Sequence, residues 1–101
     1  MKKDGAQDPS AGGDEKKDLI EYPSVYAFKV MGMQEHGFAE YVRQLFSRLM
    51  GTEISPDSLS AQPSSKGKYV SVTVSVYLLS EEHRRAIYAQ LHQEKRIVYY
   101  L

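Results

Sequence analysis

Two short polar segments carry the residues best suited to hold an anion. The first, Ser64-Ser65-Lys66-Gly67-Lys68, places hydroxyls, backbone N–H groups and two cations in five consecutive positions. Such a turn suits a phosphate, a carboxylate or a partner surface. The segment lacks the G-x-x-x-x-G-K-[ST] spacing of a Walker phosphate-binding loop. A strand is predicted after it, whereas a Walker loop is followed by a helix. The alternative is an ordinary β-hairpin turn in which Gly67 supplies a positive φ.

The second segment runs from Gly32 to Gly37 and joins a predicted strand to a predicted helix. Unpaired N–H groups at the start of that helix favour an anionic group such as a carboxylate. Gly32 would let a ligand approach the backbone, so Gly32→Val is predicted to abolish binding and leave the fold intact. The predicted effector-binding residues are Gly32, Met33, Gln34, His36 and Gly37. The alternative is that Gly32 ends the strand and Gly37 eases entry into the helix.

Other reactive side chains do not form a pattern typical of catalysis. The chain has no cysteine, which excludes disulfides and thiolate chemistry. His36, His83 and His92 lack the spacing of a metal pair, and no G-x-S-x-G elbow occurs. The adjacent Glu81 and Glu82 suit the first turn of a helix better than an acid/base pair. We therefore predict a protein that is not an enzyme and that uses no metal and no cofactor.

Composition divides the 101 residues into a tail and one domain. Residues 1–18 are polar, with almost no apolar side chain to bury, and predict a disordered tail. Residues 19–101 predict a single small domain. The formal net charge is zero, which argues against a general nucleic-acid binder. No apolar run could span a bilayer and no signal peptide is evident, so we expect a cytoplasmic protein without membrane contact.

Hydrophobic periodicity predicts the order strand, helix, strand, strand, helix, strand. Apolar residues recur at helical spacing from Phe38 to Leu49, with Gly51 as the C-terminal cap. Ser80 is the predicted N-cap of a second helix that ends at Lys95 and Arg96. The predicted strands are Val25 to Met31, Ser58 to Gln62, Lys68 to Leu79 and Ile97 to Leu101. The segment Ser58 to Gln62 has a low strand propensity, so this strand is expected at an edge of the sheet.

This order predicts an α+β protein with the ferredoxin-like βαββαβ fold. Its four-stranded antiparallel sheet would have the strand order 4-1-3-2, with both helices on one face. The third strand alternates valine with Tyr, Ser and Thr, so one face should meet the core and the other the solvent. Tyr69 and Tyr77 on that open face allow an alternative function, single-stranded RNA binding. The Ser and Thr residues between them, and the neutral charge, make nucleic acid the less favoured partner.

Two segments resemble a known family. Tyr22-Pro23-Ser24 running on to Lys29-Val30-Met31-Gly32, and Pro63 to Tyr69 followed by Ser71-Val72, are similar to the signatures of the YbeD-like bacterial proteins of unknown function. The resemblance spans roughly residues 19–101. It implies a fold like that of ACT regulatory domains, which bind small molecules and often pair. It supplies no catalytic residues.

The resemblance and the residues together predict a small non-enzymatic regulatory module. Its predicted partners are a second copy in a homodimer, a small anionic effector, or a partner protein such as an enzyme. In ACT-like domains the loop after the first strand commonly lines the effector site, which agrees with the choice of Gly32 to Gly37. For the homodimer, the expected contacts are the edge around Ser58 to Gln62 or the open face bearing Tyr69 and Tyr77.

Overall fold

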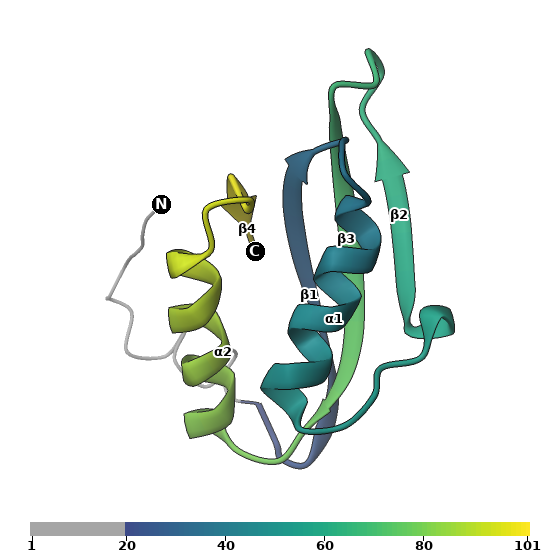
Figure 1. The fold of residues 1–101 in the computed structure, drawn as a ribbon. Coiled ribbons are helices and arrows are strands. Elements are labelled where there is room, and N and C mark those ends of the chain that lie inside the picture. Colours follow the sequence, from purple (N-terminus) through teal and green to yellow (C-terminus); the bar gives the residue numbers. More distant parts are fainter. Residues whose placement is uncertain (1–19) are drawn as a thin grey trace.

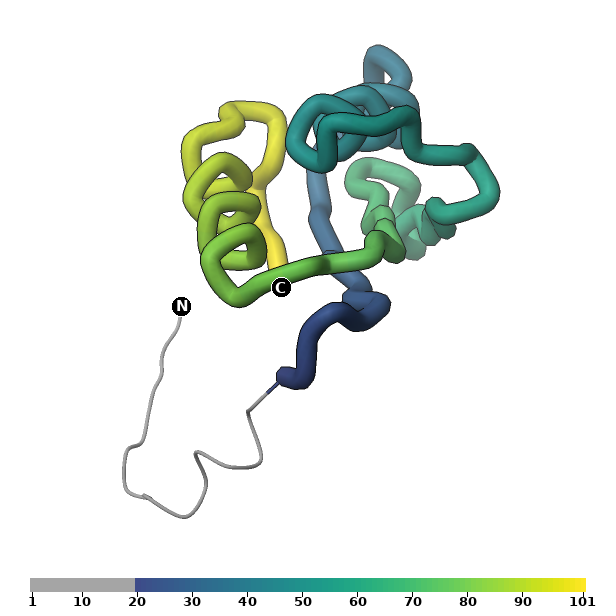
Figure 2. Tube along the Cα trace, turned by 90° about the horizontal axis from the view of Figure 1, so that it is seen from below, coloured from purple at the N-terminus to yellow at the C-terminus, as the bar shows by residue number. Residues whose placement is uncertain are grey.

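The computed structural model describes residues 20–101, and the predicted tail lies outside them. The strands pair in the order β2-β3-β1-β4, all antiparallel, which confirms the predicted sheet. Both helices lie on one face of this sheet, and the other face is uncovered in the described part of the chain (Figures 1 and 2). The fold is therefore ferredoxin-like. In chain order the elements are β1 (Ser24–Met33), α1 (Phe38–Met50), the short 3-10 helix η2 (Pro56–Ser58), β2 (Leu59–Pro63), β3 (Tyr69–Leu78), α2 (Glu81–Gln93) and β4 (Tyr99–Tyr100).

The central pair of strands, β1 and β3, carries the alternation that separates core from solvent. Ten residues of each strand are in register, from Ser24 opposite Leu78 to Met33 opposite Tyr69. Alternate residues of β3 are buried, as its valine pattern predicted. The residues between them face away from both helices, because successive side chains of a strand point to opposite faces.

The helices begin and end where the local sequence supplies suitable caps. The Ser80 hydroxyl accepts a hydrogen bond from the His83 N–H at 3.1 Å and caps α2. Gly51 has φ 72° and ends α1, because this left-handed conformation costs glycine little. The hydrophobic stripe of α1 buries Phe38, Val42 and Phe46 against the sheet.

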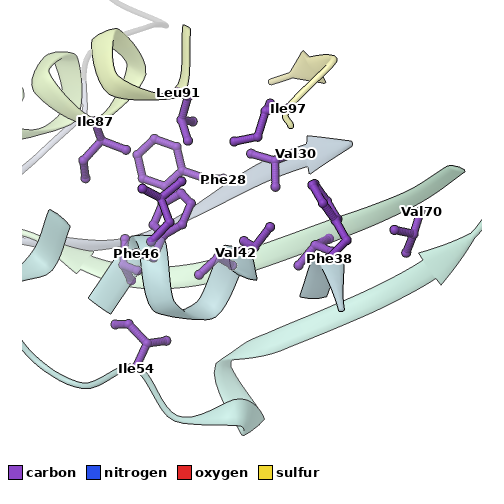
Figure 3. Close-up of a cluster of buried hydrophobic side chains, with 14 of the residues drawn as sticks. Phe28, Val30, Phe38, Val42, Phe46, Ile54, Val70, Ile87, Leu91 and Ile97 are labelled. Carbon is purple, nitrogen blue, oxygen red and sulfur yellow. The ribbon is translucent and has the colours of Figure 1, made fainter. Parts of the chain in front are cut away.

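The core lies between the helix layer and the inner face of the sheet (Figure 3). The rings of Phe28 and Phe46 lie 5.4 Å apart between their centroids, and Ile87 and Leu91 cover them from α2. All of these side chains are almost fully buried. The same core anchors both helices, so it fixes the loops that connect the two layers.

Several predicted boundaries were wrong by one to three residues. β1 does not stop before Gly32 but runs through it to Met33. Pro63 belongs to β2 and not to the following turn, and Ser58 belongs to η2. β3 begins and ends one residue inside the predicted limits. α2 ends at Gln93, before the predicted Lys95 and Arg96, and β4 is only two residues long.

Within the described residues, neither helix has the length and the run of apolar residues that crossing a bilayer requires.

Candidate functional site

The first predicted effector residue, Gly32, lies inside the packed fold. A Cβ atom there would lie 2.3 Å from Cε1 of Phe38 and 2.6 Å from the carbonyl oxygen of Arg96. The absent side chain therefore makes room for the Phe38 ring. The space through which a ligand was to approach this backbone is filled by the protein itself.

The loop that follows β1 is held in a defined conformation. Gln34 donates its N–H to the Lys68 carbonyl at 2.8 Å, which ties the loop to the start of β3. His36 and Gly37 both adopt left-handed conformations, with φ 53° and 63°. The Arg96 guanidinium donates to the Glu35 carbonyl at 2.6 Å and lies 4.6 Å from the centre of the Tyr41 ring. A non-glycine residue with positive φ is uncommon, and these contacts stabilise it here.

The loop leads to a helix start that has no side-chain cap among the described residues. The first backbone bond of α1 joins the Tyr41 N–H to the Gly37 carbonyl at 2.9 Å, which leaves the N–H groups before it for other acceptors. A hollow of about 350 Å³ lies beside them and is lined by Gln34, Glu35, Gly37, Phe38, Ala39 and Val70. Glu35 is one of its lining residues and carries a negative charge, which disfavours an anion nearby. Met33 and His36 do not line it.

The second predicted site, Ser64 to Lys68, forms a closed hairpin turn. The Ser64 N–H donates to the Tyr69 carbonyl at 2.8 Å, and the Ser64 hydroxyl accepts from the Tyr69 N–H at 3.2 Å. Gly67 has φ 73° and donates to the Ser64 carbonyl at 2.9 Å. Several polar groups of the turn are thus engaged in its own geometry. Ser65 and Lys66 are exposed, and anion binding at this turn stays a prediction.

The fold brings the two predicted segments to the same end of the sheet. The Gln34–Lys68 hydrogen bond and the pairing of Met33 with Tyr69 join them directly. Lys68 does not point into the hollow at the helix start, since its ammonium lies 5.6 Å from the centre of the Tyr69 ring. The two segments are therefore neighbours without forming one binding site.

A cluster of tyrosines around Arg84, between β1 and α2, was missed by the sequence reasoning. The Arg84 guanidinium lies 5.3 Å from the ring centres of both Tyr26 and Tyr88, whose hydroxyls are 2.9 Å apart. The Tyr22 hydroxyl donates to Glu81 at 2.6 Å, and this bond is the main cause that lowers the pKa of that carboxyl. The signal available was that a partly buried tyrosine needs a partner for its hydroxyl.

The outer face of the sheet exposes apolar side chains near both ends. Lys29 is exposed near the middle of this face, and no strand residue on it in the described part of the chain is acidic. Val25 and Tyr77 pair across the strands at one end, with 70% and 57% of their surfaces exposed. The large apolar side chains exposed on this face are Val25, Met33, Tyr77 and Tyr99, together with Leu101 beside Lys29.

A larger hollow, of about 690 Å³, lies where the α1–η2 connection meets the ends of β1 and β3. Its walls include Val25, Ile54 and Leu79, together with His83, whose Nε2 lies 3.1 Å from the Leu49 carbonyl oxygen. Among residues 20–101, no three His, Asp or Glu side chains gather where they could hold a metal ion. The chemistry offered is therefore that of an apolar surface with scattered hydroxyls.

Comparison with known proteins gives a consistent family match. The family model described as "Protein of unknown function (DUF493)" matches residues 17–101. A UPF0250 protein of Leptothrix cholodnii is 36% identical over 76 residues, which cover 75% of this chain and 82% of that protein. UPF0250 protein IL0958 of Idiomarina loihiensis is 31% identical over 84 residues, covering 83% and 92%. These matches agree with the resemblance to YbeD-like proteins.

A solved structure supports the fold independently. The solution structure of protein HP0495 from H. pylori aligns with a TM-score of 0.65 and covers 94% of this chain and 96% of its own. Its sequence is 22% identical, so the likeness concerns the fold.

Proposed function

Because the chain belongs to the DUF493 family, whose function is unknown, we propose its role from its surface: a non-catalytic interaction module that pairs with a second copy through the open face of its sheet. The observation that carries this proposal is the uncovered sheet face with exposed apolar side chains near both ends. Exposed apolar side chains grouped on one uncovered face are a mark of interaction sites in soluble proteins.

The chemistry of the face suits a second copy of the same chain. In a two-fold interface the same patch is used twice, so each group must find a partner within that patch. Within residues 20–101 no strand residue on the face of Lys29 is acidic, but Tyr77 and Tyr99 offer aromatic rings. A lysine ammonium over a tyrosine ring is attracted by about 0.5–2 kcal/mol, depending on how far it is desolvated. The apolar ends would bury each other while Lys29 meets a ring of the partner.

The predicted effector role has less support from the geometry. The Phe38 ring fills the space beside Gly32, and the acidic residue Glu35 is among those that line the hollow at the helix start. The RNA alternative needs bases to stack near the middle of β3, where Ser71, Thr73 and Ser75 lie. Binding of an anionic effector and cytoplasmic location both stay predictions. A regulatory role would follow if pairing controls access to a partner protein.

The proposal is tested by the mass of the protein in solution. Size-exclusion chromatography with light scattering at micromolar concentration should give twice the mass of the chain. Met33→Asp and Tyr99→Asp place a charge in the apolar surface, and each should give a monomer. Ala86→Asp is the matched control because Ala86 is exposed on α2, in the opposite layer, and this variant should remain a dimer.

Two results would contradict the proposal. The first is a monomer at high protein concentration. The second is a dimer that both sheet-face variants leave unchanged. Salt-dependent binding of single-stranded RNA that Lys29→Ala abolishes would instead support the alternative function.

A further inference from the structure

The second edge of β1 is paired over only part of its length. β4 is in register with Val30 and Met31, and Lys29 exchanges backbone hydrogen bonds with Leu101 at 3.2 and 2.7 Å. Figure 1 shows β4 beside the upper part of β1, whereas α2 extends down beside the rest of that strand. In the described residues no strand continues the line of β4 along the first half of β1.

This unpaired half presents backbone groups in a regular pattern. Hydrogen bonds along one side of an antiparallel strand come from alternate residues. Since Lys29 bonds toward β4, the N–H and C=O groups of Ala27 and Val25 point to the same side. Neither residue has a hydrogen-bond partner there among residues 20–101, and the side chains of both are exposed.

The opposite edge of the sheet, formed by β2, is protected against pairing. Pro63 has no N–H to donate, and the Leu59 N–H already donates to the Pro56 carbonyl. Natural edge strands are commonly blunted in this way to prevent unwanted association. Within residues 20–101 the first half of β1 shows no such protection, so it is the edge at which a further strand can add.

Two cations lie near this edge, Arg84 on α2 beside the Tyr26 ring and Lys29 on β1. Arg84 and Arg85 share the carboxylate of Glu81, at 2.9 and 3.1 Å. The Arg84 Nε is buried without a hydrogen-bond acceptor in the described residues. Lys29, exposed on the open face two residues along from Ala27, forms no ion pair within residues 20–101. A carboxylate arriving beside β1 would therefore complement existing charge.

We propose that an extended acidic segment of a partner protein binds here as an added strand, in line with β4 and paired with Val25 and Ala27 of β1. The partner residue opposite Tyr26 would point toward α2, because Tyr26 does, and an acidic side chain there would approach Arg84. The partner residues on either side would point to the open face and meet the apolar surface near Val25. This mode of recognition takes affinity from the backbone and specificity from alternate side chains.

A short synthetic peptide tests the proposal on the full chain. The probe is the blocked peptide Ser-Val-Glu-Val-Ser, and its control carries Lys in place of Glu. Titration followed by ¹⁵N NMR should shift the amides of Val25 and Ala27, and the acidic peptide should bind more tightly than its control. Ala27→Pro removes an edge donor and should weaken binding by about tenfold. Ala61→Pro makes the same substitution on the exposed β2 strand and should leave binding unchanged.

The variant Arg84→Gln separates the contribution of charge to peptide binding from the contribution of the backbone hydrogen bonds. This variant should still bind but should reduce the preference for the acidic peptide. Binding is also measured in Met33→Asp, so that the result does not depend on pairing of the sheet face.

The proposal is overturned if Ala27→Pro and Ala61→Pro bind the peptide equally, or if the amides of Val25 and Ala27 do not shift. It is also overturned if those amides are protected from hydrogen exchange in the unliganded protein. Protection that is independent of concentration would mean that the chain covers its own edge. Protection that rises with concentration would mean that a second copy does.

Discussion

At the scale of single residues, Gly32 shows how a glycine can be required by packing and not by a ligand. Its neighbours, the Phe38 ring and the Arg96 carbonyl, lie within 2.6 Å of where a Cβ would be. Forcing extra atoms into such a site costs about 1–3 kcal/mol. Gly32→Ala should therefore lower the free energy of unfolding by about that amount, and Gly32→Val by more, as measured by urea denaturation.

A double variant checks the cause of this loss. Gly32→Ala combined with Phe38→Leu relieves the contact with the ring, so it should lose less stability than the sum of the two single variants. Additive losses would show that the ring is not what excludes the side chain. A stable Gly32→Val protein would restore the prediction that this glycine serves a ligand.

Another residue-scale prediction concerns the hydroxyl of Tyr41, which joins the two helices. It donates to the Glu94 carboxylate at 2.5 Å, and burial together with this bond raises the pKa of Tyr41 to about 12 from 10.0. A pKa raised by folding adds stability below pH 10, and this stability is lost as the pH rises toward 12. The melting temperature should fall over that range, and it should fall less in Tyr41→Phe. Tyr77→Phe is the control, since Tyr77 is exposed, and it should behave like the wild type.

At the scale of elements, the register of β3 can be tested by two neighbouring substitutions. Val74 is completely buried, so Val74→Asp places an unpaired charge in the core and should unfold the protein. Thr73 lies on the opposite face and is partly exposed, so Thr73→Asp should leave a cooperative unfolding transition by circular dichroism. Equal tolerance of both changes would contradict the observed register.

The helices, the strands and their order could be predicted because each has a local pattern. Examples are the apolar stripe that begins at Phe38, the alternating valines of β3 and the cap at Ser80. Boundaries failed where a distant partner sets the end of an element. β1 continues through Gly32 because Val70 and Tyr69 of β3 extend the ladder beside it, and no local signal reports that pairing.

The candidate sites were less predictable, for a related reason. Spacing showed that Gly32 to Gly37 precede a helix, but not that Phe38 folds back over Gly32. The unpaired edge at Val25 and Ala27 depends on how far β4 reaches along β1, which is a property of the assembled sheet. The contact of Tyr26 and Tyr88 with Arg84 arises only when α2 packs on β1.

At the scale of the whole molecule, residues 20–101 contain a complete core between one sheet and two helices. Removal of residues 1–18 should therefore leave the melting temperature within about two degrees of that of the full chain. Differential scanning calorimetry of the two proteins measures this difference. A fall of several degrees would show that residues 1–18 add to the stability of the domain.

The long ladder between β1 and β3 also has a consequence for the time that folding takes. Met33 pairs with Tyr69 and Ser24 with Leu78, so each rung joins residues more than about 35 positions apart. Closing such loops costs entropy before any contact repays it, and proteins rich in distant pairings refold on the order of milliseconds to seconds. Stopped-flow refolding should show a phase in this range. Until the ladder closes, Phe28 and Val30 are uncovered, and in that interval a newly made chain is most open to aggregation or to capture by a chaperone.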